Sequence, residues 1–231
     1  MAYGCKFLMM TRIITEIEPQ KKDPKRVNIY LDGKYAFSLN GILGAWLRIG
    51  QDLSDERMNS MISEDEHEKA YQKALHFLSF RPRSIHEVQK NLLGRGIPTQ
   101  MIDETIQRLR ENSLLDDLKF SQEWIRNRMD FRPRSRAALS MELKLKGIPE
   151  DVIQTAFEED VDDEKMAFLA ARKVLRKLES LNRLEFRKKL SDHLARRGFS
   201  YASINPVVSY LWNDLHTGTD LRESNDHEDL E

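Results

Sequence analysis

The residues most able to do chemistry in this chain are arginines and lysines that recur at one spacing. Arginine flanks proline in Arg81-Pro82-Arg83, and the same turn returns 51 residues later as Arg132-Pro133-Arg134. A second series, Arg95, Lys146 and Arg197, stands directly before three glycines. Cations repeated in this way can neutralise phosphates along a nucleic acid or pair with carboxylates on a protein filament. They can equally cap helix C-termini or bridge acidic linkers, which would make their role structural.

Two further basic groups lie close together in the last third of the sequence. They are Lys173, Arg176 and Lys177, and then Arg187, Lys188 and Lys189. Between residues 164 and 198 eleven basic residues face four acidic ones, although the whole chain has a net charge of only −1. Such segregation suits a chain that meets a polyanion or an oppositely charged protein face, and ordinary solvated helix faces are the alternative. Because few acids lie near these groups, we expect them to form a functional basic face.

Residue patterns typical of enzymes and metal sites are missing from the sequence. The six histidines show no metal-binding spacing, and the single cysteine, Cys5, excludes a thiolate zinc site. Gly94-Arg95-Gly96 lacks the lysine and hydroxyl residue of a phosphate-binding loop. We therefore predict no catalytic, cofactor-binding or metal-binding residues. One alternative is a magnesium-dependent nuclease built on Asp160, Asp162 and Asp163, although these acids are more simply interpreted as a helix-capping linker.

The composition describes a soluble protein rich in helix. Apolar residues make up 40% and charged residues 32% of the chain, and no apolar run approaches the roughly 20 residues of a membrane-spanning helix. A single cysteine suits a reducing compartment. We expect a cytoplasmic monomer without a membrane partner.

A tandem array organises most of the chain. Gly96, Gly147 and Gly198 stand 51 residues apart, and apolar residues around them keep the same register. A fixed period of this length indicates one supersecondary unit stacked on copies of itself. Units of this size must bury faces against one another, so we expect the tryptophans and phenylalanines at repeat positions to be mostly core. The predicted fold is mainly α, with three tandem three-helix repeats in an elongated array.

The N-terminal part of the sequence differs from the repeats. Alternating apolar residues around Asp32-Gly33 predict a β-hairpin, with a further strand at 12–17 and short helices at 40–48 and 54–62. A capping box at Ser63 is expected to open the next helix, and Thr99 to cap the third helix of the first repeat. The predicted domains are a disordered start at 1–10, the hairpin with short helices at 11–62, three-helix repeats at 63–115, 116–161 and 162–215, and an acidic disordered tail at 216–231.

Several further motifs occur together in this chain. They are the Arg-x-Arg-Ser turn followed by Glu87-Val88 and Leu92, the Gly-Ile-Pro before a third helix, the run Leu114-Leu115-Asp116-Asp117 followed by Phe120 and Trp124-Ile125, Arg126 and Arg128 in the same helix, and the stretch from Asn28 to Phe37. Together they resemble the RecX family, regulators of the bacterial recombinase RecA. The resemblance covers residues 11–215, and the third repeat departs from it because its Arg-Pro-Arg turn is lost.

The resemblance implies a protein that is not an enzyme and that binds within the groove of the RecA filament on DNA. Such a protein restrains filament growth and the recombinase and coprotease activities, and so acts in DNA repair, recombination and the SOS response. The alternative from the residues alone is a direct DNA-binding protein that uses a basic helical face. Candidate contacts to recombinase or DNA rest on charge and repeat position: Arg81, Arg83, Arg95, Arg126, Arg128, Arg132, Arg134, Lys146, Lys173, Arg176, Lys177, Arg187, Lys188, Lys189 and Arg197.

Overall fold

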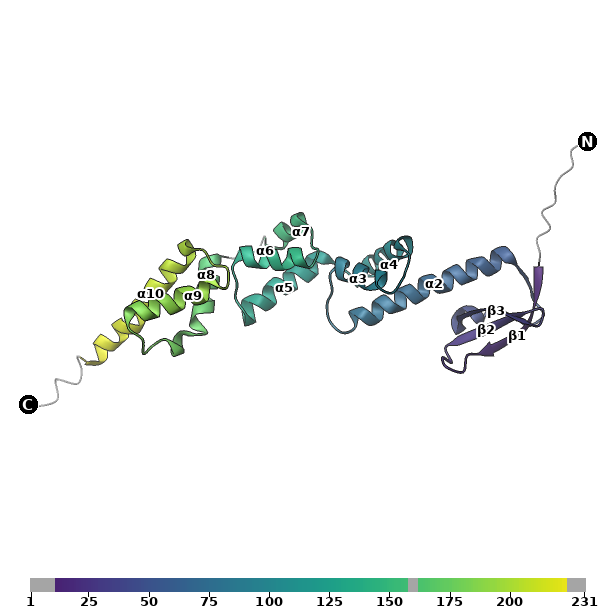
Figure 1. Ribbon diagram of the computed structural model, residues 1–231, viewed down its shortest axis with the longest axis horizontal. Coiled ribbons are helices and arrows are strands. Elements are labelled where there is room, and N and C mark those ends of the chain that lie inside the picture. The colour runs from purple at the N-terminus through teal and green to yellow at the C-terminus, as the bar shows by residue number, and fades with distance from the viewer. Residues whose placement is uncertain (1–10, 158–161, 224–231) are drawn as a thin grey trace, which may run out of the picture. The chain divides into compact units, whose positions relative to one another are not determined.

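The computed structural model describes the backbone of residues 11–157 and 162–223 and side chains as far as 216. The fold is mainly α, with three three-helix repeats and a small N-terminal sheet, as predicted (Figure 1). The chain forms two compact units, of which the first holds the sheet, the residues up to Arg81 and Gln89–Glu111. The second holds Pro82–Val88 and the residues from Asn112 onward. The expected disordered segments at 1–10 and 224–231 lie outside the described residues.

The N-terminal sheet contains the predicted hairpin. Its strands are β1 (Thr11–Pro19), β2 (Arg26–Leu31), β3 (Lys34–Asn40) and β4 (Asp52–Ser54), arranged in the antiparallel order β3-β2-β1-β4. Asp32 and Gly33 both have positive φ angles, of 50° and 77°, as a two-residue hairpin turn of this type requires. Sequence reasoning missed β4, which pairs with the start of β1, because three residues without clear alternation give little local signal.

One long helix replaces the two helices expected between residues 54 and 78. After the short α1 (Gly41–Gly44), α2 runs unbroken from Asp55 to Leu78. Its N-cap is Ser54, whose hydroxyl accepts from the Arg57 amide at 3.2 Å. Ser63, expected to start a new helix, lies inside α2 and its carbonyl contacts the His67 ring at 2.6 Å. The prediction was wrong because no proline or glycine interrupts this stretch, so nothing ends the helix there.

A buried carboxylate joins the sheet to α2. Asp65 is only 2% exposed, and it accepts from both terminal guanidinium nitrogens of Arg26, from Lys69 Nζ and from the Asn40 amide. The Arg26 guanidinium also donates to the Ser38 carbonyl on β3. Burial alone would raise the pKa of Asp65, but the hydrogen bonds from these partners outweigh it, and the pKa lies below its usual value. The carboxylate is therefore ionised and fixes the hairpin against the helix.

The remaining helices build the three repeats. They are α3 (Ile85–Leu93), α4 (Thr99–Glu111), α5 (Asp117–Phe131), α6 (Arg136–Leu145), α7 (Glu150–Ala156), α8 (Asp163–Arg172), the 3-10 helix η1 (Leu175–Lys177), α9 (Arg183–Ala195) and α10 (Tyr201–Glu223). Thr99, expected to cap α4, is its first residue instead. α10 continues to Glu223, beyond the point at residue 216 where we expected disorder to begin.

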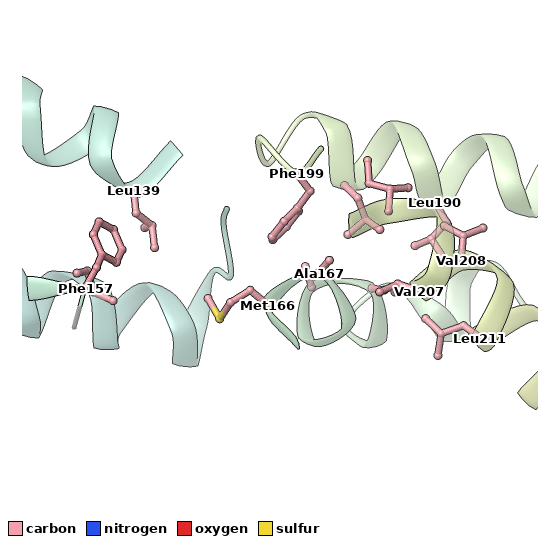
Figure 2. Packing of buried hydrophobic residues seen from close by; sticks show 14 of the residues in the cluster. Leu139, Phe157, Met166, Ala167, Leu190, Phe199, Val207, Val208 and Leu211 are labelled. Atoms are coloured by element: carbon pink, nitrogen blue, oxygen red, sulfur yellow. The ribbon is translucent and has the colours of Figure 1, made fainter. Parts of the chain in front are cut away.

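Repeats 2 and 3 share one hydrophobic core. Leu139 and Phe157 of repeat 2 belong to the same buried cluster as Leu190 and Phe199 of repeat 3, and Met166 of α8 lies between the two groups (Figure 2). Phe120, Phe157, Phe186 and Phe199 are buried, in agreement with the expected core. Phe80 and Phe131 are 69% and 70% exposed, so for these two phenylalanines the expectation was wrong.

The third repeat ends the array with a changed second helix. α9 begins one turn earlier than its counterparts, with Asn182 as N-cap, and Phe186 stands where the earlier repeats have the buried Ser84 and Ser135. Phe186 packs edge-to-face on Trp212 of α10, with ring centroids 5.2 Å apart. An aromatic pair thus fills the position at which the earlier repeats receive a following unit.

Replacing Asp65 by alanine is expected to lower the free energy of unfolding by about 3 kcal/mol, because Arg26 would be left partly buried without its counter-charge. Urea unfolding followed by circular dichroism measures the change. Asp103→Ala removes an exposed carboxylate from α4 and serves as the control. Equal stability of the two variants would contradict the role given to Asp65.

Candidate basic interface at the repeat joints

The repeated glycines end the second helix of each repeat in one conformation. Gly96, Gly147 and Gly198 have φ angles of 75°, 75° and 87°. In each case the glycine amide and the amide after it bond back to carbonyls of the last helical turn, which is the pattern of a Schellman motif. The apolar residue after each glycine is buried. The glycines therefore act first as helix stops.

Two of the three glycines also contact the preceding repeat. We call the contact of Ser84–Glu87 with Lys146-Gly147 joint 1–2, and the contact of Ser135–Ala138 with Arg197-Gly198 joint 2–3. A Cβ built on Gly147 would lie 2.4 Å from the His86 Cβ, and one on Gly198 would lie 2.7 Å from the Ser135 Oγ. At Gly96 the same test finds nothing within 4 Å. Glycine is thus required at the joints for space as well as for its backbone conformation.

The acidic pairs before the first helices hold both joints. Asp116 caps its own helix α5, while Asp117 Oδ1 accepts from the Ile85 amide of the preceding repeat at 2.9 Å. In the same way Asp162 caps α8, while Asp163 Oδ1 accepts from the Arg136 amide at 2.7 Å. Each pair therefore caps one helix in its own repeat and one in the repeat before. Sequence reasoning interpreted Asp162 and Asp163 as part of a helix-capping linker but missed the second partner.

The basic residues before the glycines have structural partners. Lys146 Nζ lies 2.8 Å from Glu87 Oε1 and 5.2 Å from the centroid of the Trp124 ring. Arg197 donates to the Pro133 carbonyl at 3.2 Å and to His193 Nε2 at 2.9 Å. Arg95 donates to Asn91 on its own helix. This series contributes to joints and helix ends rather than forming a free row of cations.

The residues of the Arg-Pro-Arg turns and of α5 divide into bound and exposed groups. Glu142 accepts from Arg128 at 2.8 Å and from Arg134 at 3.1 Å, and the Arg128 guanidinium lies over the Trp124 ring. Arg132 and Arg126 are exposed. In the first turn Arg81 is exposed and Arg83 is half-buried.

The two C-terminal basic groups also contain both residues with a bonded partner and residues without one. Lys173 Nζ donates to the carbonyls of Asp130 and Phe131, at 2.6 and 2.9 Å, and so caps the C-terminal end of α5. Arg187 donates to Asn205 of α10 at 2.6 Å. All six side chains are exposed, and among the described residues those of Arg176, Lys177, Lys188 and Lys189 make no hydrogen bond or ion pair. The expected basic face is therefore confined to η1 and the middle of α9.

At joint 2–3, more positively charged side chains act on one another than their positions in the sequence indicated. Burial lowers the pKa of Arg197, and repulsion from Arg134, Arg132 and Arg196 lowers it further. The pKa of His193 is also lowered, by burial and then by Arg197 and Arg196. His193 is thus neutral near pH 7 and accepts the Arg197 hydrogen bond. Sequence reasoning missed Arg196 and His193, whose only signal was their place in the last turn of the helix before Gly198.

The acids that could have supported an enzyme are used as helix caps. Asp162 and Asp163 cap helix starts, and Asp160 lies outside the described residues. Within residues 11–157 and 162–223, no group of three or more His, Cys, Asp or Glu side chains is placed to hold a metal ion. No helix in that part of the chain is long and apolar enough to cross a membrane.

Replacing each of the three glycines by alanine distinguishes the cost of backbone strain from the cost of crowding at the joints. Gly96→Ala is expected to cost about 1 kcal/mol of folding free energy, because only the left-handed conformation penalises it. Gly147→Ala and Gly198→Ala are expected to cost about 2–4 kcal/mol each, because the new methyl group also meets the preceding repeat. Chemical denaturation of the three variants gives the comparison, and equal losses would show that the joints tolerate a side chain.

Two histidines are expected to give opposite pH dependences. The folded-state pKa of His193 is lowered, so the unfolded chain binds its proton more readily and stability falls as pH drops through about 6.5. The pKa of His67 is raised by its bond to the Ser63 carbonyl and then by Glu104, so its contribution is present at low pH and is lost as pH rises. Relative to the parent protein, His193→Gln should gain stability at about pH 5 and His67→Gln should lose it, as measured by urea midpoints. Shifts of the same sign would contradict these assignments.

Comparison with known proteins agrees with this architecture along the whole array. The model of the "Regulatory protein RecX N-terminal domain" matches residues 12–54, and the models of the first, second and third RecX three-helix domains match 70–109, 116–156 and 162–208. A "Regulatory protein RecX" of Bacillus pumilus is 33% identical over 204 residues, which span 87% of this chain and 78% of the relative. One of Bacillus licheniformis is 35% identical over 199 residues, or 84% and 76% of the two chains.

A solved structure gives the same result for the fold. The "Crystal structure of regulatory protein RecX" superposes with a TM-score of 0.64 at 27% identity, covering 85% of this chain and 98% of that one. Four consecutive family models, relatives of this similarity and a matching fold lead to one conclusion. The chain belongs to the RecX family of regulatory proteins.

Proposed function

We propose that this protein modulates a RecA-type recombinase by binding the recombinase filament on DNA and restraining its extension and activities. The observation that carries the proposal is the array of three repeats, held together at two joints, in a chain of the RecX family. The resemblance to that family supplies the recombinase as the partner. The protein would act in the cytoplasm as a monomer, without chemistry of its own.

A repeat array suits a repeating partner. Successive units can contact successive protomers of a filament, and several weak contacts together bind tightly while each stays reversible. Inhibition then follows if the bound array blocks addition of the next protomer, or if it prefers an inactive filament state. Either route needs fewer inhibitor molecules than recombinase molecules.

The exposed basic residues of η1 are the contact that we would test first. Arg176 and Lys177 are exposed, and among the described residues their side chains make no ion pair. Lys173, although close in sequence, caps α5 and is better left intact. A charge reversal at Arg176 and Lys177 therefore changes the surface without removing a structural contact.

The test is the DNA-dependent ATPase of the recombinase on single-stranded DNA, titrated with this protein below equimolar amounts. We expect inhibition at ratios well below one per recombinase. Reversal of Arg176 and Lys177 to glutamate should raise the half-inhibitory concentration roughly tenfold by weakening one of several contacts. Reversal of Lys21 and Lys22, two exposed lysines between β1 and β2, makes the same change of charge elsewhere.

Two outcomes would count against the proposal. Inhibition only at amounts that saturate the DNA would mean that the protein competes for the strand, as a direct DNA-binding protein does. Equal loss in the two charge-reversal variants would remove η1 from the interface and leave net charge as the explanation.

A further inference from the structure

An open groove lies between the first and third helices of repeat 3, and we call it the α8–α10 groove. Phe168 of α8 and Pro206, Val207 and Tyr210 of α10 line it with apolar surface, and its volume is about 530 Å³. Val207 is buried, whereas 59% of Tyr210 is exposed. The volume lies within the range of roughly 300–1,000 Å³ that is usual for binding sites. The other lining residues belong to the N-terminal end of α8, and they are Asp162, Glu164 and Lys165.

Repeat 1 fills the equivalent place with its own side chains. The repeat alignment puts Tyr71 at the position of Phe168 and Arg108 at the position of Tyr210. The Arg108 guanidinium lies 3.8 Å from the centroid of the Tyr71 ring and bonds to Glu68 at 2.8 Å. Tyr71 is therefore only 8% exposed. Repeat 3 has lost this arginine, and the groove stays open. The helices align through their buried alanines, Ala70 and Ala74 on α2 with Ala167 and Ala171 on α8.

Charge is distributed unevenly along the groove. At the N-terminal end of α8, Asp162 and Glu164 stand against Lys165 alone, so this end is negative. Among the described residues, the Glu164 side chain makes no hydrogen bond or ion pair. Arg172 belongs to the last turn of α8, and its guanidinium is 5.9 Å from the Phe168 ring centroid, at the limit of a cation–π contact. An occupant that meets both the rings and Glu164 needs an apolar side chain with a cation beside it.

The N-terminal element of this chain carries a surface of that kind. Ile42, Trp46 and Ile49 follow one another at helical spacing, and they are 76%, 81% and 67% exposed. Leu43 and Leu47, on the opposite side of the same segment, pack into the core of the sheet domain. Three large apolar side chains left in water on one side of a folded segment are typical of an interaction site.

The segment that carries these side chains is fixed and has a cation within it. The Gly41 amide donates to the Lys25 carbonyl at 2.7 Å, and the Gly50 amide donates to the Ile14 carbonyl at 2.8 Å. Arg48 is exposed, and among the described residues its side chain makes no ion pair. We call Ile42, Trp46 and Ile49, together with Arg48, the N-terminal ridge.

We propose that the N-terminal ridge of one copy binds in the α8–α10 groove of a second copy, with Trp46 against the rings of Phe168 and Tyr210 and Arg48 paired with Glu164. A second copy accounts for both surfaces at once, because the ridge has the apolar anchor and the cation that the groove lacks. The two surfaces are different, so the contact is heterologous. Each copy keeps one free ridge or groove, and further copies can join in an open series.

A contact of this size is weak in solution. Three apolar side chains and one arginine bury less than the roughly 1,200 Å² of a stable interface, so the dilute protein is a monomer. Copies already bound side by side on a filament would be at a high effective concentration, and the same contact would then join them. The inference goes beyond the proposed function, and it can be measured without recombinase.

The first test is sedimentation of the full chain over a concentration series. We expect the weight-average mass to rise above the 27.1 kDa of the monomer as the protein concentration increases from about 10 to 200 µM. Trp46→Ala and Tyr210→Arg should each weaken association about tenfold, because one removes the anchor and the other opposes Arg48 with a second cation. Tyr210→Arg also gives repeat 3 the arginine that fills the groove of repeat 1.

Matched controls change exposed aromatic residues outside the two surfaces. Tyr35→Ala removes a ring that is 58% exposed on β3, and Tyr201→Arg makes the same substitution as Tyr210→Arg at the start of α10. Both should associate as the parent protein does. Thermal unfolding of each variant verifies that it is folded.

Mixing the two defective variants gives the sharpest test. The Trp46→Ala protein keeps an intact groove, and the Tyr210→Arg protein keeps an intact ridge. Each alone should remain a monomer at concentrations where the parent associates. An equimolar mixture should form a dimer with one copy of each and grow no further, because only one intact ridge and one intact groove can meet.

Several results would overturn the inference. A parent protein that stays monomeric to about 200 µM would show that the ridge and the groove do not bind each other. A mixture that stays monomeric, although the parent associates, would show that association uses other surfaces. Loss of recombinase inhibition in Tyr210→Arg, with no association of the parent, would assign the groove to the recombinase, so that this inference fails while the proposed function stands. Association as expected, in a protein that does not inhibit the recombinase, would support this inference and contradict the proposed function.

Discussion

The space between two backbones at each joint constrains the rest of the array. The first turn of one repeat's second helix approaches the last turn of the next repeat's second helix so closely that a side chain cannot stand at Gly147 or Gly198. Polar groups on the two sides of each joint bond to one another. The Ser84 hydroxyl donates to the Lys146 carbonyl at 2.6 Å, and the Ser135 amide donates to the Arg197 carbonyl at 3.2 Å. Directional hydrogen bonds of this kind fix the register of the bonded segments in a way that apolar packing alone does not.

The joints also explain why the compact units and the sequence repeats divide the chain at different residues. The first turn of α3 is bonded to α5 and α6, whereas the rest of the helix belongs with α4. Helix caps are shared in the same manner, because Asp117 and Asp163 each serve a helix in the preceding repeat. The helix caps of repeats 1 and 2 are therefore complete only when the following repeat is present, and dependence on neighbouring units is usual in repeat proteins.

Features set by local chemistry could be predicted from the sequence, and features set by distant contacts could not. The Asp32-Gly33 hairpin and the three helix-ending glycines follow from backbone preferences of a few neighbouring residues. The helix break expected at Ser63 was wrong, because a local capping signal was interpreted as a helix start although no helix terminator precedes it. The roles of Lys146 and Arg197 depend on partners about 60 residues away, a separation at which a single sequence gives no guide. The same period that revealed the repeats does, however, align Glu87, which pairs with Lys146, with Ala138, so the absence of this ion pair from joint 2–3 could be predicted from the sequence.

The aromatic closure of the third repeat limits how an array of this kind can grow. Phe186 and Trp212 occupy the place where a further unit would need a buried serine, an Arg-Pro-Arg turn and an open helix start. A copy of a repeat appended after α10 would find none of these groups. A copy inserted between repeats 1 and 2, or between 2 and 3, would meet a matching surface on both sides. Duplication in this architecture can therefore lengthen the array by inserting a repeat before the third one, but not by adding a repeat after it.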